Sequence, residues 1–387
     1  MLVVLDDIAI IWQIKNIKLK SGQFNTSDIE KAIRQCRGAR RRLLKLGTVN
    51  FKNVSGKSKV IDTTKIKEVF LIAAIEGGMP DFGRYYDDGN NSGNVHIFFE
   101  NFTRFAVKHL NTVSDFVEYL RYKEKFLAIH KNIILMAGGE EDLLAIYLQN
   151  KRTFGNMGEA ENVDMMLMDL EGAADELENK DEDYAEKLEA DYWSKGWDEL
   201  IERKRVGRLI LDGTQDNSPD HDKFLQKMMS HNRFERRVLG KQFFDAAAQA
   251  AKYPYKESIV YRRLIPQDGH NITYLFLFVG DQNTPREYRQ KVLYTTALAA
   301  KQIMPQNDML IAIASELHMI KTPNCSFEWV MLDMTADEFE KGYGDRAREY
   351  REKLNIWKNV KMHESHAWEY PSDAREQVKK KTDKNNA

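Results

Sequence analysis

The chain has 387 residues and a net charge of −1, and its apolar fraction of 42% is ordinary for a globular protein. No apolar run approaches the roughly 20 residues that a membrane-spanning helix needs, and the start lacks the features of a signal peptide. Two cysteines, Cys36 and Cys325, are too few for a disulfide framework or a four-cysteine zinc site. We therefore expect no membrane segment and a reducing, cytoplasmic location.

The near-zero net charge hides two segments of opposite sign. Between Lys31 and Lys67 the chain is rich in Lys and Arg, and Asp62 is the only acidic residue there. Between Glu159 and Glu199, Asp and Glu far outnumber Lys. Such asymmetry suggests a lobe that faces a polyanion beside an acidic lobe. For the acidic segment a solvated helical surface is the simpler interpretation, whereas for the basic segment both interpretations stay open.

The first 150 residues show patterns of both strands and helices. Residues 2–5 and 8–15 are apolar, β-branched runs on either side of Asp6-Asp7, which predicts a hairpin. A helix is predicted over 27–46, with Ser27 as its N-cap and Gly47 just past its end. Further along we expect strands at 66–75 and 95–99, and helices at 101–110, 113–128 and 139–150. The pattern predicts an α/β domain over 1–150 with a small mixed sheet.

The remaining residues divide into three further segments. Residues 151–255 are helical and acidic in pattern, and their cluster of Arg233, Arg236 and Arg237 fits contact with either nucleic acid or the acidic helices. A second α/β domain is predicted over 256–372, with strands at 258–264, 271–279, 309–315 and 327–333 and a helix at 284–303. Residues 373–387 are charged and lack apolar periodicity, so we expect a flexible tail.

The hairpin places two polar side chains together. A two-residue turn pairs Leu5 with Ile8, and it brings Met1 opposite Trp12. Strand alternation puts Gln13 and Lys15 on one face, at the end of an otherwise apolar strand. Taken alone, such a pair is more often a plain polar strand end than a site.

Together, this hairpin and the basic helix after it resemble PD-(D/E)xK (restriction-endonuclease-like) nucleases, and in particular nuclease-related-domain and Mrr-like endonucleases. The resemblance rests on LVVLDDIAIIWQIKNIKL and DIEKAIRQCRGARRRLL. It implies a restriction-endonuclease-like core and hydrolysis of phosphodiesters, DNA before RNA, with Mg²⁺ or Mn²⁺. Gln13 and the carbonyl of Ile14 would be metal ligands, and Lys15 would position the attacking water. The phosphate backbone would be contacted by Gln35, Arg34, Arg37, Arg40 and Arg41.

One departure from the family pattern leaves two functions open. The family Asp that shares the metal belongs directly before Leu2, at or beyond the given start. We expect either a longer natural protein or the loss of the metal site. The first function is a nuclease, for which the resemblance implies a role in restriction or defence. The second is a non-catalytic scaffold that binds nucleic acid, or that binds a protein partner through the acidic helical region.

Overall fold

A computed structural model shows a chain of the α/β class that separates into two compact units. The first unit comprises Met1–Glu189 and Tyr370–Ala387, and the second comprises Ala190–Glu369. The structure describes residues 1–17, 26–52, 58–77, 86–87, 93–129, 133–155, 166–205, 219–254, 260–281, 283–321, 325–357 and 367–375.

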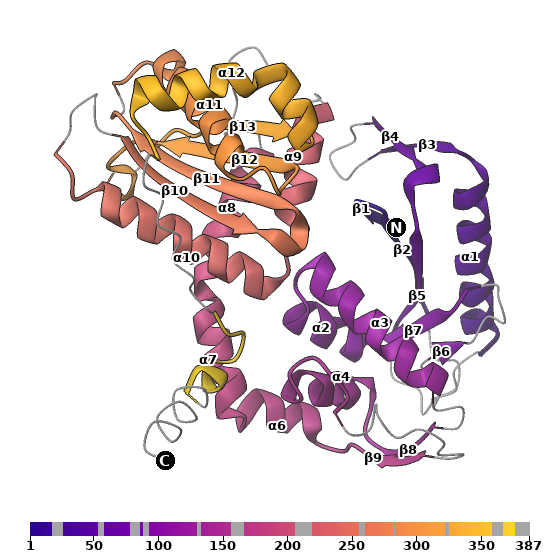
Figure 1. Ribbon diagram of the computed structural model, residues 1–387. Helices are drawn as coiled ribbons and strands as arrows, with labels where there is room; N and C mark the ends of the chain where they lie inside the picture. Colours follow the sequence, from indigo (N-terminus) through magenta and orange to yellow (C-terminus); the bar gives the residue numbers. More distant parts are fainter. Residues whose placement is uncertain are drawn as a thin grey trace. The chain divides into compact units, whose positions relative to one another are not determined.

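A five-stranded mixed sheet forms the centre of the first unit (Figure 1). Parallel pairing joins its three central strands, and an antiparallel strand lies at each edge. Helices cover both faces of the central strands, which explains why their sequences are nearly continuous apolar runs. In sheet order the strands are β1 (Leu2–Leu5), β2 (Ile8–Asn16), β5 (Glu68–Glu76), β7 (Val95–Phe99) and β6 (Tyr86–Asp87).

The predicted hairpin register is confirmed. Leu5 lies opposite Ile8, as a two-residue turn requires, and Asp6 adopts a left-handed φ of 50° in that turn. The amide of Trp12 donates to the carbonyl of Met1 at 2.9 Å, which extends the pairing to the end of β1.

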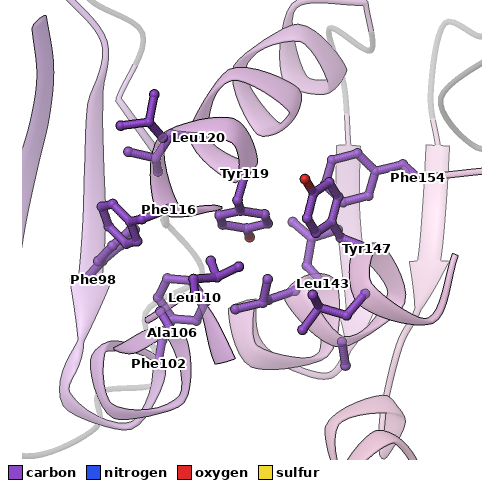
Figure 2. Close-up of a cluster of buried hydrophobic side chains, with 14 of the residues drawn as sticks. Phe98, Phe102, Ala106, Leu110, Phe116, Tyr119, Leu120, Leu143, Tyr147 and Phe154 are labelled. Carbon is purple, nitrogen blue, oxygen red and sulfur yellow. The ribbon is translucent and has the colours of Figure 1, made fainter. Parts of the chain in front are cut away.

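The two faces of this sheet are covered by different helices (Figure 1). Helix α1 (Thr26–Lys45) packs on the face that carries Ala9 and Ile11. Helices α2 (Glu100–His109) and α3 (Val113–Ile129) belong to the core on the opposite face. Figure 2 shows that core, where aromatic rings from β7, α2, α3 and α4 (Glu140–Gln149) gather: Phe98, Phe102, Phe116, Tyr119 and Tyr147.

Several local predictions need correction. Helix α1 begins at Thr26, so Ser27 lies in its first turn and is not the residue before it. Gly47 does follow the helix with a φ of 63°, as expected of a glycine at a helix end. A hairpin of β3 (Thr48–Lys52) and β4 (Ser58–Asp62) was not predicted, and a short 3₁₀ helix, η1 (Thr63–Lys65), follows it.

The region predicted to be helical from 151 to 255 contains a strand and is divided between the units. Strand β9 (Met166–Asp169) pairs in parallel with β8 (Ile133–Ala137), which was also not predicted. Helices α6 (Ala173–Asn179) and α7 (Glu182–Ala190) then bury Leu177 and Tyr184 in the core of the first unit. The compact units therefore do not divide at the predicted boundaries of 150 and 255, because α6 and α7 join the core of the first unit whereas the helices after Ala190 join that of the second.

The end of the described chain also packs on the first unit. The hydroxyl of Tyr370 donates to the carbonyl of Leu148 at 2.6 Å. Residues 371–375 are helical, and Arg375 forms an ion pair with Glu186 at 2.8 Å. The first residues of the predicted flexible tail are therefore ordered, while 376–387 lie outside the described residues.

The second unit is built on a four-stranded sheet of order β10-β11-β12-β13 (Figure 1). Its strands are β10 (Val260–Gln267), β11 (Ile272–Val279), β12 (Met309–Ser315) and β13 (Glu328–Asp333), close to the predicted positions. The parallel pair β11 and β12 is joined through α11 (Arg286–Ile303), which packs on one face with α12 (Ala336–Leu354), a helix that was not predicted.

The opposite face of this sheet is covered by α8 (Ser194–Arg205), α9 (Pro219–Met229) and α10 (Arg233–Ala250). The short 3₁₀ helices of this unit are η2 (Asp191–Trp193), η3 (Asp268–His270) and η4 (Met319–Lys321). Across both units, none of the described helices combines the length and the apolar character that crossing a membrane requires.

Candidate functional site

Gln13 and Lys15 lie together at the end of β2, on the face predicted from strand alternation. Both side chains are half-buried, whereas Ile14 between them is 48% exposed. In the parallel register, Gln13 lies beside Ala73 and Lys15 beside Ile75 of β5, so both neighbours are apolar. The amide nitrogen of Gln13 reaches the carbonyl of Ile14 at 3.5 Å, the outer limit of a hydrogen bond. The position is as predicted, and the catalytic roles remain predictions.

A buried thiol lies beneath this part of the strand. Cys36 of α1 is buried, and its sulfur donates to the carbonyl of Ile72 at 3.5 Å. Burial raises the pKa of the Cys36 thiol to about 11. The thiol is therefore protonated at neutral pH, and it packs as an apolar group of the core.

The side of α1 that faces away from the sheet is strongly basic. Arg34 and Arg41 are exposed and lie seven positions apart, so they project from the same side of the helix. In the described part of the chain, neither of them is paired with a carboxylate. Gln35 is exposed beside Arg34. We call this surface the α1 basic face, and its exposed cations are Lys31, Arg34, Arg41, Arg42 and Lys45.

Arg37 has a different environment, although it was predicted to act with Arg34 and Arg41. Its guanidinium is half-buried and forms an ion pair with Asp87 of β6. The Nε of Arg37 also donates to the carbonyl of Gly93 at 3.2 Å. Arg37 therefore links α1 to the β6 edge of the sheet, and its guanidinium N–H groups already have hydrogen-bond partners within the unit.

The C-terminal end of α1 borders a hollow. Its lining consists of four cations and two leucines, namely Arg40, Arg41, Arg42, Leu44, Lys45 and Leu46. The half-buried Arg40 packs against Gly93, whose added Cβ would lie 3.1 Å from the Cδ of Arg40. The predicted contact residues Arg40 and Arg41 thus lie together at this hollow. Basic side chains at a helix C-terminus also offset the partial negative charge of its free carbonyls.

Gly38 occupies the middle of the α1 basic face. It lies between Arg34 and Arg41, and a Cβ added there would meet nothing within 4 Å. Glycine is an unfavourable residue in a helix interior, by about 1 kcal/mol relative to alanine. The open space above Gly38 lets another backbone approach the helix closely.

The described residues around Gln13 do not by themselves fit a Mg²⁺ or Mn²⁺ site. Hard divalent ions favour charged carboxylate oxygens, whereas Gln13 and the carbonyl of Ile14 are both neutral ligands. Within the described ranges, a single group of at least three His, Cys, Asp or Glu side chains has a metal-binding arrangement, and it belongs to the second unit. No catalytic step through a metal is therefore derived at Gln13.

The second basic cluster, in α10, is used within the protein. Arg233 and Arg236 contact opposite oxygens of Asp198, at 2.5 and 2.9 Å. Arg237 pairs with Asp191 at 3.2 Å. Of the two interpretations that the sequence left open, the structure supports contact with the acidic helices.

One group of polar residues in the second unit was missed by the sequence reasoning. His231, Glu235 and His270 lie close together, although His270 is far along the chain from the other two. The available signal was His231 and Glu235 four positions apart within the segment predicted to be helical, 151–255. No protein-family model, curated protein or solved structure matches this chain.

Proposed function

We propose that the first unit binds nucleic acid through the α1 basic face and the hollow at its C-terminal end. The observation that carries the proposal is the contrast within one helix. Arg37 is half-buried and paired with Asp87, whereas Arg34 and Arg41 point outward and have no carboxylate partner among the described residues. Cations that are not used to stabilise the fold remain available for phosphate groups.

The spacing of the cations fits a phosphate backbone. A helix rises 1.5 Å per residue, so Arg34 and Arg41 lie about 10 Å apart along the axis. On one strand of B-DNA that length covers roughly three phosphates, which are spaced about 3.4 Å apart along the helix axis. Gly38, midway between the two arginines, lets the sugar-phosphate chain approach the helix. Contacts of this kind are independent of base sequence.

The surrounding architecture agrees with the nuclease resemblance at the level of chain order. The hairpin β1–β2 is followed by helix α1 and, after the small β3–β4 hairpin and η1, by β5, which pairs in parallel with β2. We propose that this part of the first unit is a restriction-endonuclease-like core and that duplex DNA is its favoured ligand.

Fluorescence anisotropy with labelled duplex DNA, single-stranded DNA and RNA tests this binding. We expect duplex binding that weakens as salt increases, and a loss of most of that binding in Arg34→Glu/Arg41→Glu. The matched control is Lys125→Glu/Lys291→Glu, which reverses two exposed charges on α3 and α11. Equal binding by the α1 variant and the control would show that the α1 basic face is not the binding surface. A preference for RNA would change the ligand and leave the surface in place.

Phosphodiester hydrolysis is the second candidate function, and the confirmed hairpin register favours it. With that register, Gln13 and Lys15 lie side by side on one face at the end of β2, as the catalytic hairpin of the resemblance requires. Hydrolysis would need carboxylate ligands from outside the described surroundings of Gln13. Cleavage assays with Mg²⁺ and with Mn²⁺ test it on the same three substrates. Metal-dependent cleavage that is lost in Lys15→Ala and Gln13→Ala supports it, whereas intact substrates with wild type leave binding as the function.

A further inference from the structure

The second unit brings two imidazoles and a carboxylate together at one end of its sheet. His231 lies two residues before α10, Glu235 lies in the first turn of that helix, and His270 ends η3 between β10 and β11. The Nδ1 of His231 is 3.2 Å from Oε2 of Glu235, and the Nε2 of His270 is 2.8 Å from Oε1. The potential ligand atoms of all three side chains lie within 4.8 Å of one another.

Neighbouring groups fix the orientation of these side chains. Asn232 caps α10, and the backbone amide of Asn232 donates to Oε2 of Glu235 at 3.0 Å. This bond holds the carboxylate in the first turn. The Nε2 of His231 lies 2.7 Å from the hydroxyl of Tyr274 on β11, so Nδ1 is the nitrogen that faces Glu235. Trp197 packs edge-on against the ring of His231. The constellation is thus held by two helices and a strand of one compact unit.

We propose that His231, Glu235 and His270 bind a divalent transition-metal ion of the Zn²⁺ class. Two imidazole nitrogens and one carboxylate oxygen form a donor set typical of zinc and its neighbours in the first transition row, and they do not suit Mg²⁺ or Ca²⁺. Metal–ligand bonds of about 2.0–2.1 Å in a tetrahedron place neighbouring ligand atoms roughly 3.3 Å apart. The separations of 2.8 and 3.2 Å from the Glu235 carboxylate are close to that value, and the third separation, between the two ring nitrogens, lies within 4.8 Å and shortens when the ion binds.

The site is open on one side. The His231 side chain is fully buried, whereas the side chains of Glu235 and His270 are 25% and 27% exposed. An ion can therefore enter from solvent, and three protein ligands leave a coordination position for water or another small ligand. Arg236 adds a positive charge beside the site through its bond to the carbonyl of His231, and Asp198 offsets that charge.

Tyr274 provides the hydrogen-bond partner that the second ring nitrogen of a metal-binding histidine needs. When Nδ1 of His231 coordinates an ion, its Nε2 carries the proton and needs an acceptor, and the Tyr274 hydroxyl is placed to accept it. Without an ion, the same hydroxyl can donate to Nε2, so the arrangement is satisfied in both states.

Metal titration of the full-length protein, without an affinity tag and after treatment with a chelator, tests the proposal. We expect one equivalent of Zn²⁺ in calorimetry, and one equivalent of Co²⁺ with the visible absorption of a low-symmetry nitrogen and oxygen site. Glu235→Gln and His270→Ala should each weaken binding at least tenfold. The control is His318→Gln, because His318 bonds a backbone carbonyl elsewhere in the same unit.

Two features keep the test decisive. His270 is partly exposed and its side chain bonds only Glu235 in the described structure, so His270→Ala should fold, which a thermal unfolding scan verifies. Tyr274→Phe keeps all three ligands and should weaken binding by about 10–100-fold through the lost outer bond. No stoichiometric binding by wild type, or unchanged affinity in folded His270→Ala, would overturn the assignment. Either outcome leaves the nucleic-acid proposal for the first unit untouched.

Discussion

Replacing Arg34 and Arg41 together by glutamine should lower the salt dependence of duplex DNA binding by a defined amount. The two arginines are exposed on one side of α1 and have no carboxylate partner among the described residues. Each phosphate contact contributes about 0.9 to the slope of log K against log salt, so the loss of two contacts lowers the slope by about 1.8. Over a fourfold salt increase, from roughly 50 to 200 mM, the affinity of the variant should then fall about tenfold less than that of wild type.

Anisotropy titrations at several salt concentrations measure this slope directly. Arg37→Gln is the matched control, because it makes the same chemical change on the same helix at a guanidinium that is paired with Asp87. It should reduce stability and leave the slope almost unchanged. A second control, Lys125→Gln/Lys291→Gln, removes two exposed charges elsewhere. An unchanged slope in Arg34→Gln/Arg41→Gln, or an equal drop in either control, would refute the assignment of the contacts to the α1 basic face.

Three further predictions concern the stability of the two units. Arg289 and Glu328 form a buried ion pair at 3.1 Å, so Arg289→Met should cost about 3–5 kcal/mol in urea unfolding. Adding Glu328→Met should recover only part of that loss, because Arg289 also donates to the carbonyls of Asp281 and Thr284. Burial lowers the pKa of His96 to about 4, so the folded protein keeps this ring neutral while the unfolded chain takes up a proton below about pH 6.5. Stability should therefore fall by about 3 kcal/mol as the pH drops from 6.5 to 4, and the difference between wild type and His96→Gln in unfolding at several pH values isolates this contribution. Gly38→Ala should raise the free energy of unfolding by about 0.5–1 kcal/mol, because the new Cβ meets no other atom and alanine is the better helix former. Gly240→Ala should lower stability in the same thermal unfolding assay, because its new Cβ would lie 2.2 Å from a backbone oxygen.

Local patterns predicted those parts of the fold that depend on nearby residues. The Asp6-Asp7 turn and the two-residue period of the strands fix the hairpin register without any distant contact. The strands of the second sheet were predicted close to their positions because they are long apolar runs bounded by polar residues. The β3–β4 hairpin was missed although β3 alternates between exposed polar and half-buried residues, because a run of five residues with three polar ones is hard to distinguish from a loop.

Long-range packing determined what the sequence could not predict. The compact units divide after Glu189 and before Tyr370, away from the predicted boundaries of 150 and 255, because a helical pattern does not reveal which of two cores its apolar face will join. Arg37 was predicted to contact phosphate together with Arg34 and Arg41, but its partner Asp87 lies fifty positions along the chain. The cluster of His231 and His270 was overlooked because only the close approach of α10 and η3 brings the two rings together.

The most direct test of the central claim is to map where nucleic acid touches the protein. A duplex carrying a photoreactive group on its phosphate backbone is crosslinked to the full-length protein, and the crosslinked peptides are identified by mass spectrometry. Binding through the α1 basic face predicts crosslinks concentrated between Lys31 and Leu46, and their loss in Arg34→Glu/Arg41→Glu. Crosslinks confined to the second unit, or unchanged by that variant, would contradict the claim.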